Sequence, residues 1–224
     1  MYQWKLHYAG QTGLSQTGIF PNSTPGTCRG SLCPKMITLK RTLLGALWTV
    51  VAVAILAGMA AAIRLNRMHR HTAVVNRVAQ MYEVDPELIS SVIWRESRFN
   101  ASAVGGVGEI GLMQVTEVVG LEWAAAANIK EFDRNNLFDP ETNIHAGTWY
   151  LSRALQQWSD RDDPLPYALA QYNAGRSNAL RWARDSGQDA DQFIAEITYP
   201  GTQAYVRGIL ARYDRKTASR PGRQ

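Results

Sequence analysis

The chain has 224 residues, 46% of them hydrophobic, and a formal net charge of +5 at pH 7. The positive charge is confined to one part: residues 1–71 carry eight Lys or Arg and no acid, whereas residues 72–224 carry 16 basic and 19 acidic residues. Because the larger part is mildly acidic and has no basic stripe interleaved with aromatic residues, the composition argues against a nucleic-acid-binding protein and predicts no nucleic-acid partner.

Residues 1–35 are rich in Gly, Ser, Thr and Gln and show little hydrophobic periodicity, so they are predicted to be disordered. Their two cysteines, Cys28 and Cys33, are too few for a structural zinc site, and a disulfide between them is left open. Met36 is soon followed by a Lys-Arg pair and an apolar run, which is how a bacterial export signal begins. We therefore expect translation to start at Met36 and residues 1–35 to be an artefactual extension.

Residues 36–71 are predicted to form an N-terminal membrane anchor followed by a basic linker. The stretch 42–63 contains no charged residue, and about 20 apolar residues in a helix are enough to cross the hydrocarbon core of a bilayer. The run is longer than that of a secretory signal, which favours an uncleaved anchor, although the alanines at 60–62 leave cleavage open. Basic residues flank the run on both sides and do not fix its orientation.

Residues 72–216 are predicted to form an all-α domain, because apolar residues recur at helical spacing and alternating strand patterns are few. Asp139 followed by Pro140 marks the start of a long helix. Residues 217–224 are predicted to be a disordered tail. The expected helices cover residues 72–82, 85–98, 112–119, 123–129, 139–158, 166–173, 176–185, 190–196 and 202–214.

The aromatic residues and the histidines give no indication of a cofactor site. Four aromatic residues at helical spacing are expected to pack in the core: Trp149, Tyr150, Trp158 and Tyr167. The histidines do not gather with Cys or acidic residues at ligand spacing, so we expect neither a metal nor a cofactor.

The helix predicted at 85–98 carries one carboxylate, that of Glu96, near its C-terminal end. Asp85 is a favourable N-cap and Pro86 suits the first helical position. Apolar residues precede Glu96 at helical spacing, which places the carboxylate on or beside the face that packs on the core. Desolvation there would raise its pKa, as a general acid near neutral pH requires. The alternative is an ordinary solvated acid paired with a neighbouring arginine.

A glycine-rich loop follows this helix. Gly105, Gly106, Gly108 and Gly111 indicate a backbone that turns tightly or that a ligand approaches closely. The last three also match the spacing of a dinucleotide-binding fingerprint. That motif requires a preceding strand, whereas a helix is predicted here, so we reject a nucleotide site.

Three segments carry the most specific motifs of the chain. They are Glu96-Ser97-Arg98-Phe99-Asn100, Gly108-Glu109-Ile110-Gly111-Leu112-Met113-Gln114 and Gln171-Tyr172-Asn173-Ala174-Gly175. In this order they resemble the motifs of the soluble lytic transglycosylase family, and the resemblance extends from residue 73 to about residue 213. It implies an all-α, lysozyme-like catalytic domain at 72–216, preceded by a single transmembrane helix.

The resemblance also implies roles for individual residues. Glu96 would be the catalytic acid and base, and Tyr172 would reach its carboxyl. Leu112 and Met113 would form an apolar wall of the cleft. Glu109 is interpreted as a loop residue, because the acetamido group of the substrate can stabilise charge at C1 and no second carboxylate is then needed. The residues implied to bind the glycan are Gly111, Leu112, Met113, Gln114, Tyr172 and Asn173.

The implied activity is cleavage of the β-1,4 bond between N-acetylmuramic acid and N-acetylglucosamine in peptidoglycan, with formation of a 1,6-anhydromuramic acid end. Two alternatives stay open: a muramidase that uses water, and a non-catalytic glycan-binding or scaffold protein. The latter is suggested by departures from the family pattern, chiefly Gly105, where a Ser is common, and Gly201, where a Glu is common. The implied location is the bacterial inner membrane, crossed once, with the catalytic domain in the periplasm. Glycan strands would be the substrate, and cell-envelope machinery is left open as a partner.

Overall fold

The computed structural model describes residues 34–184 and 186–219, and the chain divides into two compact units, residues 1–52 and 53–224. Within the described residues the regular elements are helices, accompanied by two isolated antiparallel bridges that join Ile110 to Val104 and to Val115. The predicted all-α class is confirmed. Most of the expected N-terminal extension and the end of the expected tail lie outside the described residues, so their disorder stays a prediction.

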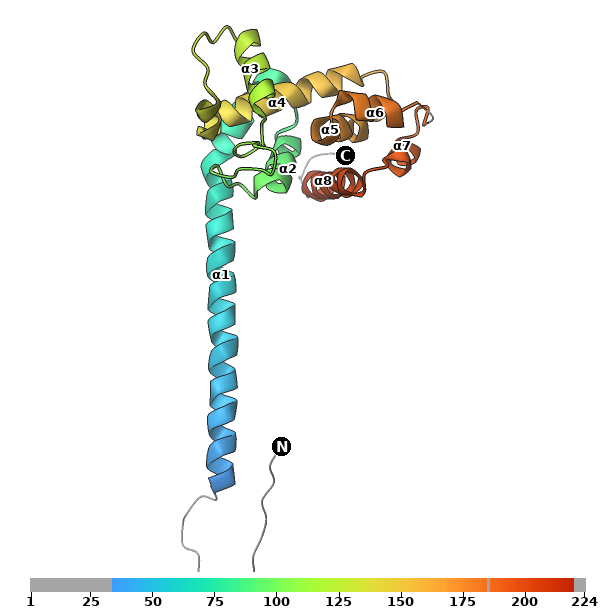
Figure 1. Cartoon of the computed structure of the whole chain (residues 1–224). Helices are drawn as coiled ribbons and strands as arrows, with labels where there is room; N and C mark the ends of the chain where they lie inside the picture. The colour runs from blue at the N-terminus through green and yellow to red at the C-terminus, as the bar shows by residue number, and fades with distance from the viewer. Residues whose placement is uncertain (1–33, 185, 220–224) are drawn as a thin grey trace, which may run out of the picture. The chain divides into compact units, whose positions relative to one another are not determined.

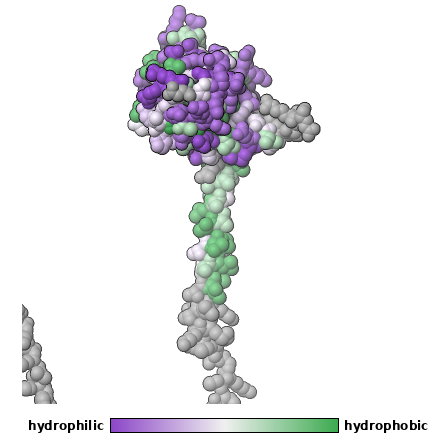
Figure 2. Space-filling view, turned by 90° about the vertical axis from the view of Figure 1, so that its right-hand side faces the viewer, coloured by the Kyte–Doolittle hydropathy of each residue, from purple (hydrophilic) through white to green (hydrophobic). Residues whose placement is uncertain are grey.

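The first helix, α1, runs without a break over Pro34–Tyr82. Its stretch Leu43–Tyr82 has a mean hydropathy of 2.3 in its most apolar window and qualifies by length and composition as a membrane span. Figure 2 shows hydrophobic residues over the visible part of α1, whereas hydrophilic residues dominate the visible face of the helical domain. The separate helix predicted at 72–82 is the C-terminal end of α1, where Val78 is fully buried.

The remaining helices form one domain in which the long helix α4 is central (Figure 1). They are α2 (Pro86–Ser97), α3 (Glu117–Ala126), the 3₁₀ helix η1 (Arg134–Phe138), α4 (Pro140–Gln157), α5 (Leu165–Ala174), α6 (Arg176–Trp182), α7 (Ala190–Glu196) and α8 (Pro200–Ala218). Helices α3, η1 and α5 all pack on α4, while α8 packs on both α2 and α5. The chain thus returns at its end to the helix that carries Glu96.

Two predicted helix starts are confirmed. Asp85 caps α2 by accepting a hydrogen bond from the N–H of Glu87 at 2.8 Å, and Asp139 caps α4 by accepting from the N–H of Thr142 at 2.8 Å. The apolar face of α2 is buried as its spacing predicted, through Leu88, Ile89, Val92 and Ile93. Packing of this face fixes the direction in which the last turn of α2 points.

Parts of the predicted helix pattern are wrong. In place of helices at 112–119 and 123–129, a single helix α3 begins after Thr116, whose hydroxyl accepts a hydrogen bond from the N–H of Val119 at 3.3 Å. Residues 112–115 instead form a turn, because the N–H of Val115 bonds to the carbonyl of Ile110 at 2.9 Å. The helix η1 was not predicted. Residues 217 and 218, which were expected in the tail, belong to α8, because this helix continues to Ala218.

Candidate active site

Glu96 lies in the last turn of α2, where the chain leaves the core and enters the glycine-rich loop. Arg98 and Phe99 adopt positive φ angles of 54° and 61°, which end the helix sharply. Ser97 ties this end to the loop, because its hydroxyl donates to the carbonyl of Leu112 at 2.8 Å. The carboxyl of Glu96 is therefore held at the junction of helix and loop.

A tyrosine from a distant part of the sequence contacts this carboxyl. Tyr205, on α8, is only 3% exposed, and its hydroxyl donates to Oε1 of Glu96 at 2.6 Å. The packing of α8 on α2 brings the two residues together. The arginine that precedes Glu96, Arg95, lies over the ring of Tyr205 at 5.6 Å from its centroid. Glu96 is thus a partly buried carboxyl held by a tyrosine, not the freely solvated acid of the alternative interpretation.

Burial raises the pKa of Glu96 from 4.5 to about 7. Three nearby groups modify this shift: the hydrogen bond from Tyr205 and the charge of Arg95 lower the pKa, whereas the charge of Glu109 raises it. The predicted upward shift is confirmed. Near neutral pH the carboxyl exists in both protonation states, as a group that first gives and then takes a proton requires.

The loop is fixed by Asn143, a residue of α4 that is 0% exposed. Its Nδ2 donates to the carbonyls of Ile110 and Leu137, and its Oδ1 accepts from the N–H of Met113, each at 2.8 Å. One side chain therefore satisfies three backbone groups around the loop. Gly111 lies between them with a φ of +79°, and a Cβ there would come within 2.7 Å of the Leu137 carbonyl, so this position requires glycine.

The predicted binding residues after Gly111 differ in exposure. The side chains of Leu112 and Met113 are 0% exposed, so the predicted apolar cleft wall is wrong: both belong to the core beneath the loop. Gln114 is partly exposed and has a φ of 48°. Its Nε2 donates to the carbonyls of Gly111 at 2.9 Å and Ala103 at 3.3 Å. The amide donors of Gln114 are thus used within the loop.

The two predicted site residues of α5 both form hydrogen bonds within the protein. The hydroxyl of Tyr172 donates to the carbonyl of Met113 at 2.9 Å, and it is Tyr205 that hydrogen-bonds to the carboxyl of Glu96. Asn173 is exposed, and its Oδ1 accepts from the hydroxyl of Thr202 at 2.8 Å. These hydrogen bonds link α5 to the loop at Met113 and to α8 at Thr202. Their contact with a glycan stays a prediction.

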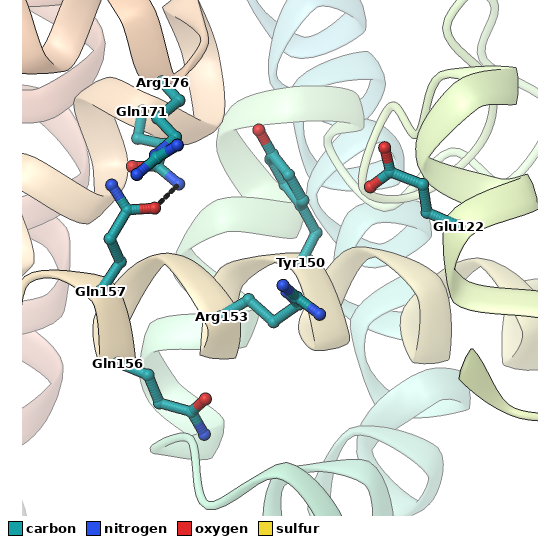
Figure 3. A pocket seen from close by; sticks show the side chains of 7 residues that line it. All are labelled: Glu122, Tyr150, Arg153, Gln156, Gln157, Gln171 and Arg176. Carbon is teal, nitrogen blue, oxygen red and sulfur yellow. Dashed lines mark hydrogen bonds between the residues drawn. The ribbon is translucent and has the colours of Figure 1, made fainter. Parts of the chain in front are cut away.

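A polar groove with a volume of about 760 Å³ lies along α4 (Figure 3). Tyr150 lines it, and the ring of Tyr150 lies 5.6 Å from that of Tyr172, so the groove begins beside the site. The prediction that Tyr150 packs in the core is wrong, whereas Trp158 and Tyr167 are buried as predicted. The remaining lining side chains are polar or charged: Glu122, Arg153, Gln156, Gln157, Gln171 and Arg176.

Sequence reasoning does not identify the roles of Tyr205 and Glu109. The segment around Tyr205 belongs to the resemblance, but no local pattern shows that α8 returns to α2. In the case of Glu109, the sequence feature that could have indicated its position is Gly105, because the missing side chain there leaves room for the Glu109 carboxylate over the loop. Among residues 34–184 and 186–219, no three His, Cys, Asp or Glu side chains gather in a way that could hold a metal ion.

Known proteins share this architecture and are similar to this chain in sequence. The family model described as the transglycosylase SLT domain matches residues 73–194, more than half of the chain. The membrane-bound lytic murein transglycosylase F of Desulfosudis oleivorans is 31% identical over 175 residues, which is 66% of this chain and 37% of that protein. The soluble lytic murein transglycosylase of Escherichia coli is 31% identical over 135 residues, 59% of this chain and 20% of that protein.

Solved structures agree with the sequence comparisons. The 70 kDa soluble lytic transglycosylase of Escherichia coli superposes with a TM-score of 0.59 at 28% identity, covering 66% of this chain and 24% of that one. An inactive mutant of the lytic transglycosylase Slt from Pseudomonas aeruginosa gives a TM-score of 0.60 at 28% identity, with the same coverage. The chain therefore belongs to the transglycosylase SLT domain family, and the implied lysozyme-like fold is confirmed. It spans well under half the length of the Desulfosudis and Escherichia relatives.

Replacing Tyr205 with Phe removes the hydrogen bond to Glu96 and keeps the buried ring. Because this bond lowers the pKa of Glu96, we expect the pKa to rise above about 7 and the basic limb of the pH–rate profile to move to higher pH. The carboxyl also loses an orienting partner, so kcat/KM at neutral pH should fall about tenfold. A pH–rate profile identical to that of the wild type in position and height would contradict this role.

Proposed function

We propose that the protein is a peptidoglycan lytic transglycosylase. The observation that carries this proposal is a single partly buried carboxyl, Glu96, whose pKa of about 7 suits it to give and take a proton in one catalytic cycle. Membership of the transglycosylase SLT domain family supports the same conclusion. The substrate class follows from the names of the relatives, which are lytic murein transglycosylases.

The reaction proceeds in two steps around Glu96. In the first, its protonated carboxyl donates a proton to the oxygen of the β-1,4 bond between N-acetylmuramic acid and N-acetylglucosamine. The bond between C1 and this oxygen breaks, and the acetamido oxygen of the muramic acid closes on C1 to give an oxazolinium ring. In the second step, the carboxylate of Glu96 takes the proton of the 6-hydroxyl, O6 attacks C1, and the oxazolinium ring opens. The product is a 1,6-anhydro ring, and Glu96 is protonated again.

The groove beside Tyr150 supports a polymeric substrate. Its volume of about 760 Å³ and its amide and guanidinium donors suit the hydroxyl and acetamido groups of sugars that lie beyond the cleaved bond. We assign the predicted glycan contacts to the exposed or partly exposed members of the predicted set, chiefly Gln114 and Asn173. Leu112 and Met113 would act only through their backbone and their packing.

We also propose that α1 anchors the protein in the inner membrane and that the catalytic domain faces the periplasm, where peptidoglycan lies. The apolar stretch Leu43–Tyr82 and the membrane-bound relatives support this placement. Protease added to spheroplasts should therefore digest the domain. A domain that becomes sensitive only after the cells are lysed would contradict the periplasmic location.

Digestion of purified sacculi tests the proposed activity. The full-length chain in detergent should release soluble glycan fragments from the insoluble polymer, more slowly as the pH rises above about 7 because Glu96 must begin protonated. Sacculi that bind the protein and stay intact at every pH would favour the non-catalytic alternative.

A further inference from the structure

The side chain of Glu109 folds back over the glycine-rich loop. Its Oε2 accepts a hydrogen bond from the N–H of Val107 at 3.1 Å, and its backbone carbonyl accepts from the N–H of Gly105 at 2.7 Å. The side chain is partly buried. Glu109 is therefore held in one conformation at the closure of the turn.

Gly105 makes this conformation possible. A Cβ at position 105 would lie 3.0 Å from Cδ of Glu109 and 2.8 Å from Oε1 of Gln114. These distances leave no room for a side chain without displacing the carboxylate or the amide. The serine that is common at this position in the family would therefore compete with Glu109 for the same space. Gly105 and Glu109 form a coupled pair, because the Glu109 carboxylate lies where a side chain at position 105 would be.

The Glu109 carboxylate belongs to the same site as Glu96. Its negative charge acts on Glu96 and contributes to the raised pKa of that carboxyl. It also lies over Gly105 beside Oε1 of Gln114, whose amide donors are already used within the loop. Two hydrogen-bond acceptors, one of them charged, therefore meet over Gly105 in the loop that follows Glu96.

We propose that Glu109 accepts a hydrogen bond from the acetamido N–H of the muramic acid residue whose glycosidic bond is cleaved, and that its charge stabilises the oxazolinium ring. This inference rests on the proposed function. When the acetamido oxygen bonds to C1, positive charge spreads onto the nitrogen, and the N–H becomes a stronger donor. A carboxylate facing that N–H binds the cation more strongly than the neutral substrate, which is the requirement for accelerating the step. No proton needs to leave the nitrogen, and the ring opens again when O6 attacks C1.

Glu109→Gln separates this role from support of the loop. The amide oxygen of Gln can still accept from Val107, so the turn is kept while the charge is lost. We expect kcat/KM to fall about tenfold to a hundredfold, mainly through kcat, because the lost interaction is stronger in the transition state. Glu131→Gln, a change of the same kind at an exposed position, should leave the rate unchanged.

The pH dependence of the rate provides a second test, because the position of its basic limb would not change if Glu109 only supported the loop. The groups that act on the carboxyl of Glu96 are Tyr205, Arg95 and Glu109, and the charge of Glu96 in turn raises the pKa of Tyr172 on α5. Removing the negative charge of Glu109 lowers the pKa of Glu96, so the basic limb in Glu109→Gln should move to lower pH. In Tyr205→Phe the limb should move the opposite way.

Substitutions at positions 105 and 109, made singly and together, test whether the two side chains compete for the same space. Gly105→Ser alone should reduce the rate, because the new side chain displaces the carboxylate of Glu109. Glu109→Ala alone should also reduce it. The double variant Gly105→Ser with Glu109→Ala should recover part of the lost rate, since the serine hydroxyl then has the room that the shortened side chain at position 109 leaves over the loop. Rates in which the two losses simply multiply would overturn the coupling.

Binding of a stable ring analogue tests the charge directly. A muramic acid thiazoline resembles the oxazolinium ring when its ring nitrogen is protonated, because it then carries both the N–H and the positive charge. The wild-type chain should bind this protonated form about tenfold more tightly than Glu109→Gln does, while both bind the open acetamido sugar alike. Equal binding of the thiazoline by the two proteins, or wild-type kcat/KM in Glu109→Gln, would overturn the proposal. A wild-type chain that releases no glycan would instead refute the proposed function. Products that end in a reducing sugar would likewise refute the proposed function, because water and not O6 would then have attacked C1.

Discussion

Glu96→Gln is expected to lower the rate of glycan cleavage by about 10² to 10⁴-fold, because it removes the proton that both steps of the reaction use. The substitution keeps the size of the side chain, and its amide oxygen can still accept the hydrogen bond from Tyr205. The loss should therefore appear in kcat, measured on soluble glycan fragments, with little change in the binding of sacculi. The comparison with Glu109→Gln is informative, since that change should cost less.

The same variant should be more stable than the wild type above neutral pH. The pKa of Glu96 is about 7 in the folded protein and 4.5 in the unfolded reference, so the folded state holds the proton more tightly. The free energy of unfolding of the wild type therefore falls as the pH rises from about 4.5 to about 7, by up to about 3 kcal/mol, whereas Glu96→Gln loses none of this. Urea unfolding at pH 5 and pH 8 measures the difference.

Two outcomes would contradict this account of Glu96. A variant with the wild-type rate would remove its catalytic role. A variant whose stability advantage is the same at pH 5 and pH 8 would show that the carboxyl does not titrate near neutrality in the folded protein. The two results are independent, because one concerns the reaction and the other only the burial of the group.

Asn143→Leu should destabilise the domain by about 3 to 5 kcal/mol, since three backbone groups lose the partner that satisfies them. Asn143 is fully buried and bonds to the carbonyls of Ile110 and Leu137 and to the N–H of Met113. Leucine has a similar volume but neither donates nor accepts. The loop around Gly111 would lose its attachment to α4, so activity should fall even at temperatures where the domain stays folded.

Urea unfolding with a matched control measures this effect. Asn76→Leu introduces the same chemical change at an exposed position of α1 and should alter the free energy of unfolding by no more than about 0.5 kcal/mol. Equal destabilisation by the two substitutions would mean that the hydrogen bonds of Asn143 contribute little to stability.

The parts of the site that were predictable depend on local patterns. Asp85 and Pro86 mark the start of α2, and the spacing of its apolar residues places Glu96 beside the buried face. From that placement alone a raised pKa follows, and the structure agrees. The same reasoning located the start of α4 from Asp139. Each of these features is encoded within one helix.

The parts that were missed depend on contacts between distant segments. Tyr205 reaches Glu96 only because α8 packs on α2, and no feature near Tyr205 encodes that packing. The turn at 112–115 was predicted to be helical because its residues are apolar, whereas their burial and the bonds to Asn143 determine its backbone. The position of the Glu109 side chain was missed for a related reason. Its carboxylate lies over Gly105, and this contact depends on how the loop folds.

The chemical form of the new chain end is the most direct test of the proposed reaction. Mass spectrometry of fragments that the full-length chain releases from purified sacculi should show muramic acid ends closed as 1,6-anhydro rings, because O6 of the substrate attacks C1 in place of water. Glu96→Gln should form these ends about 10² to 10⁴-fold more slowly than the wild type. Ends that carry one additional water molecule, and so are reducing sugars, would contradict the transglycosylase reaction and identify the protein as a muramidase.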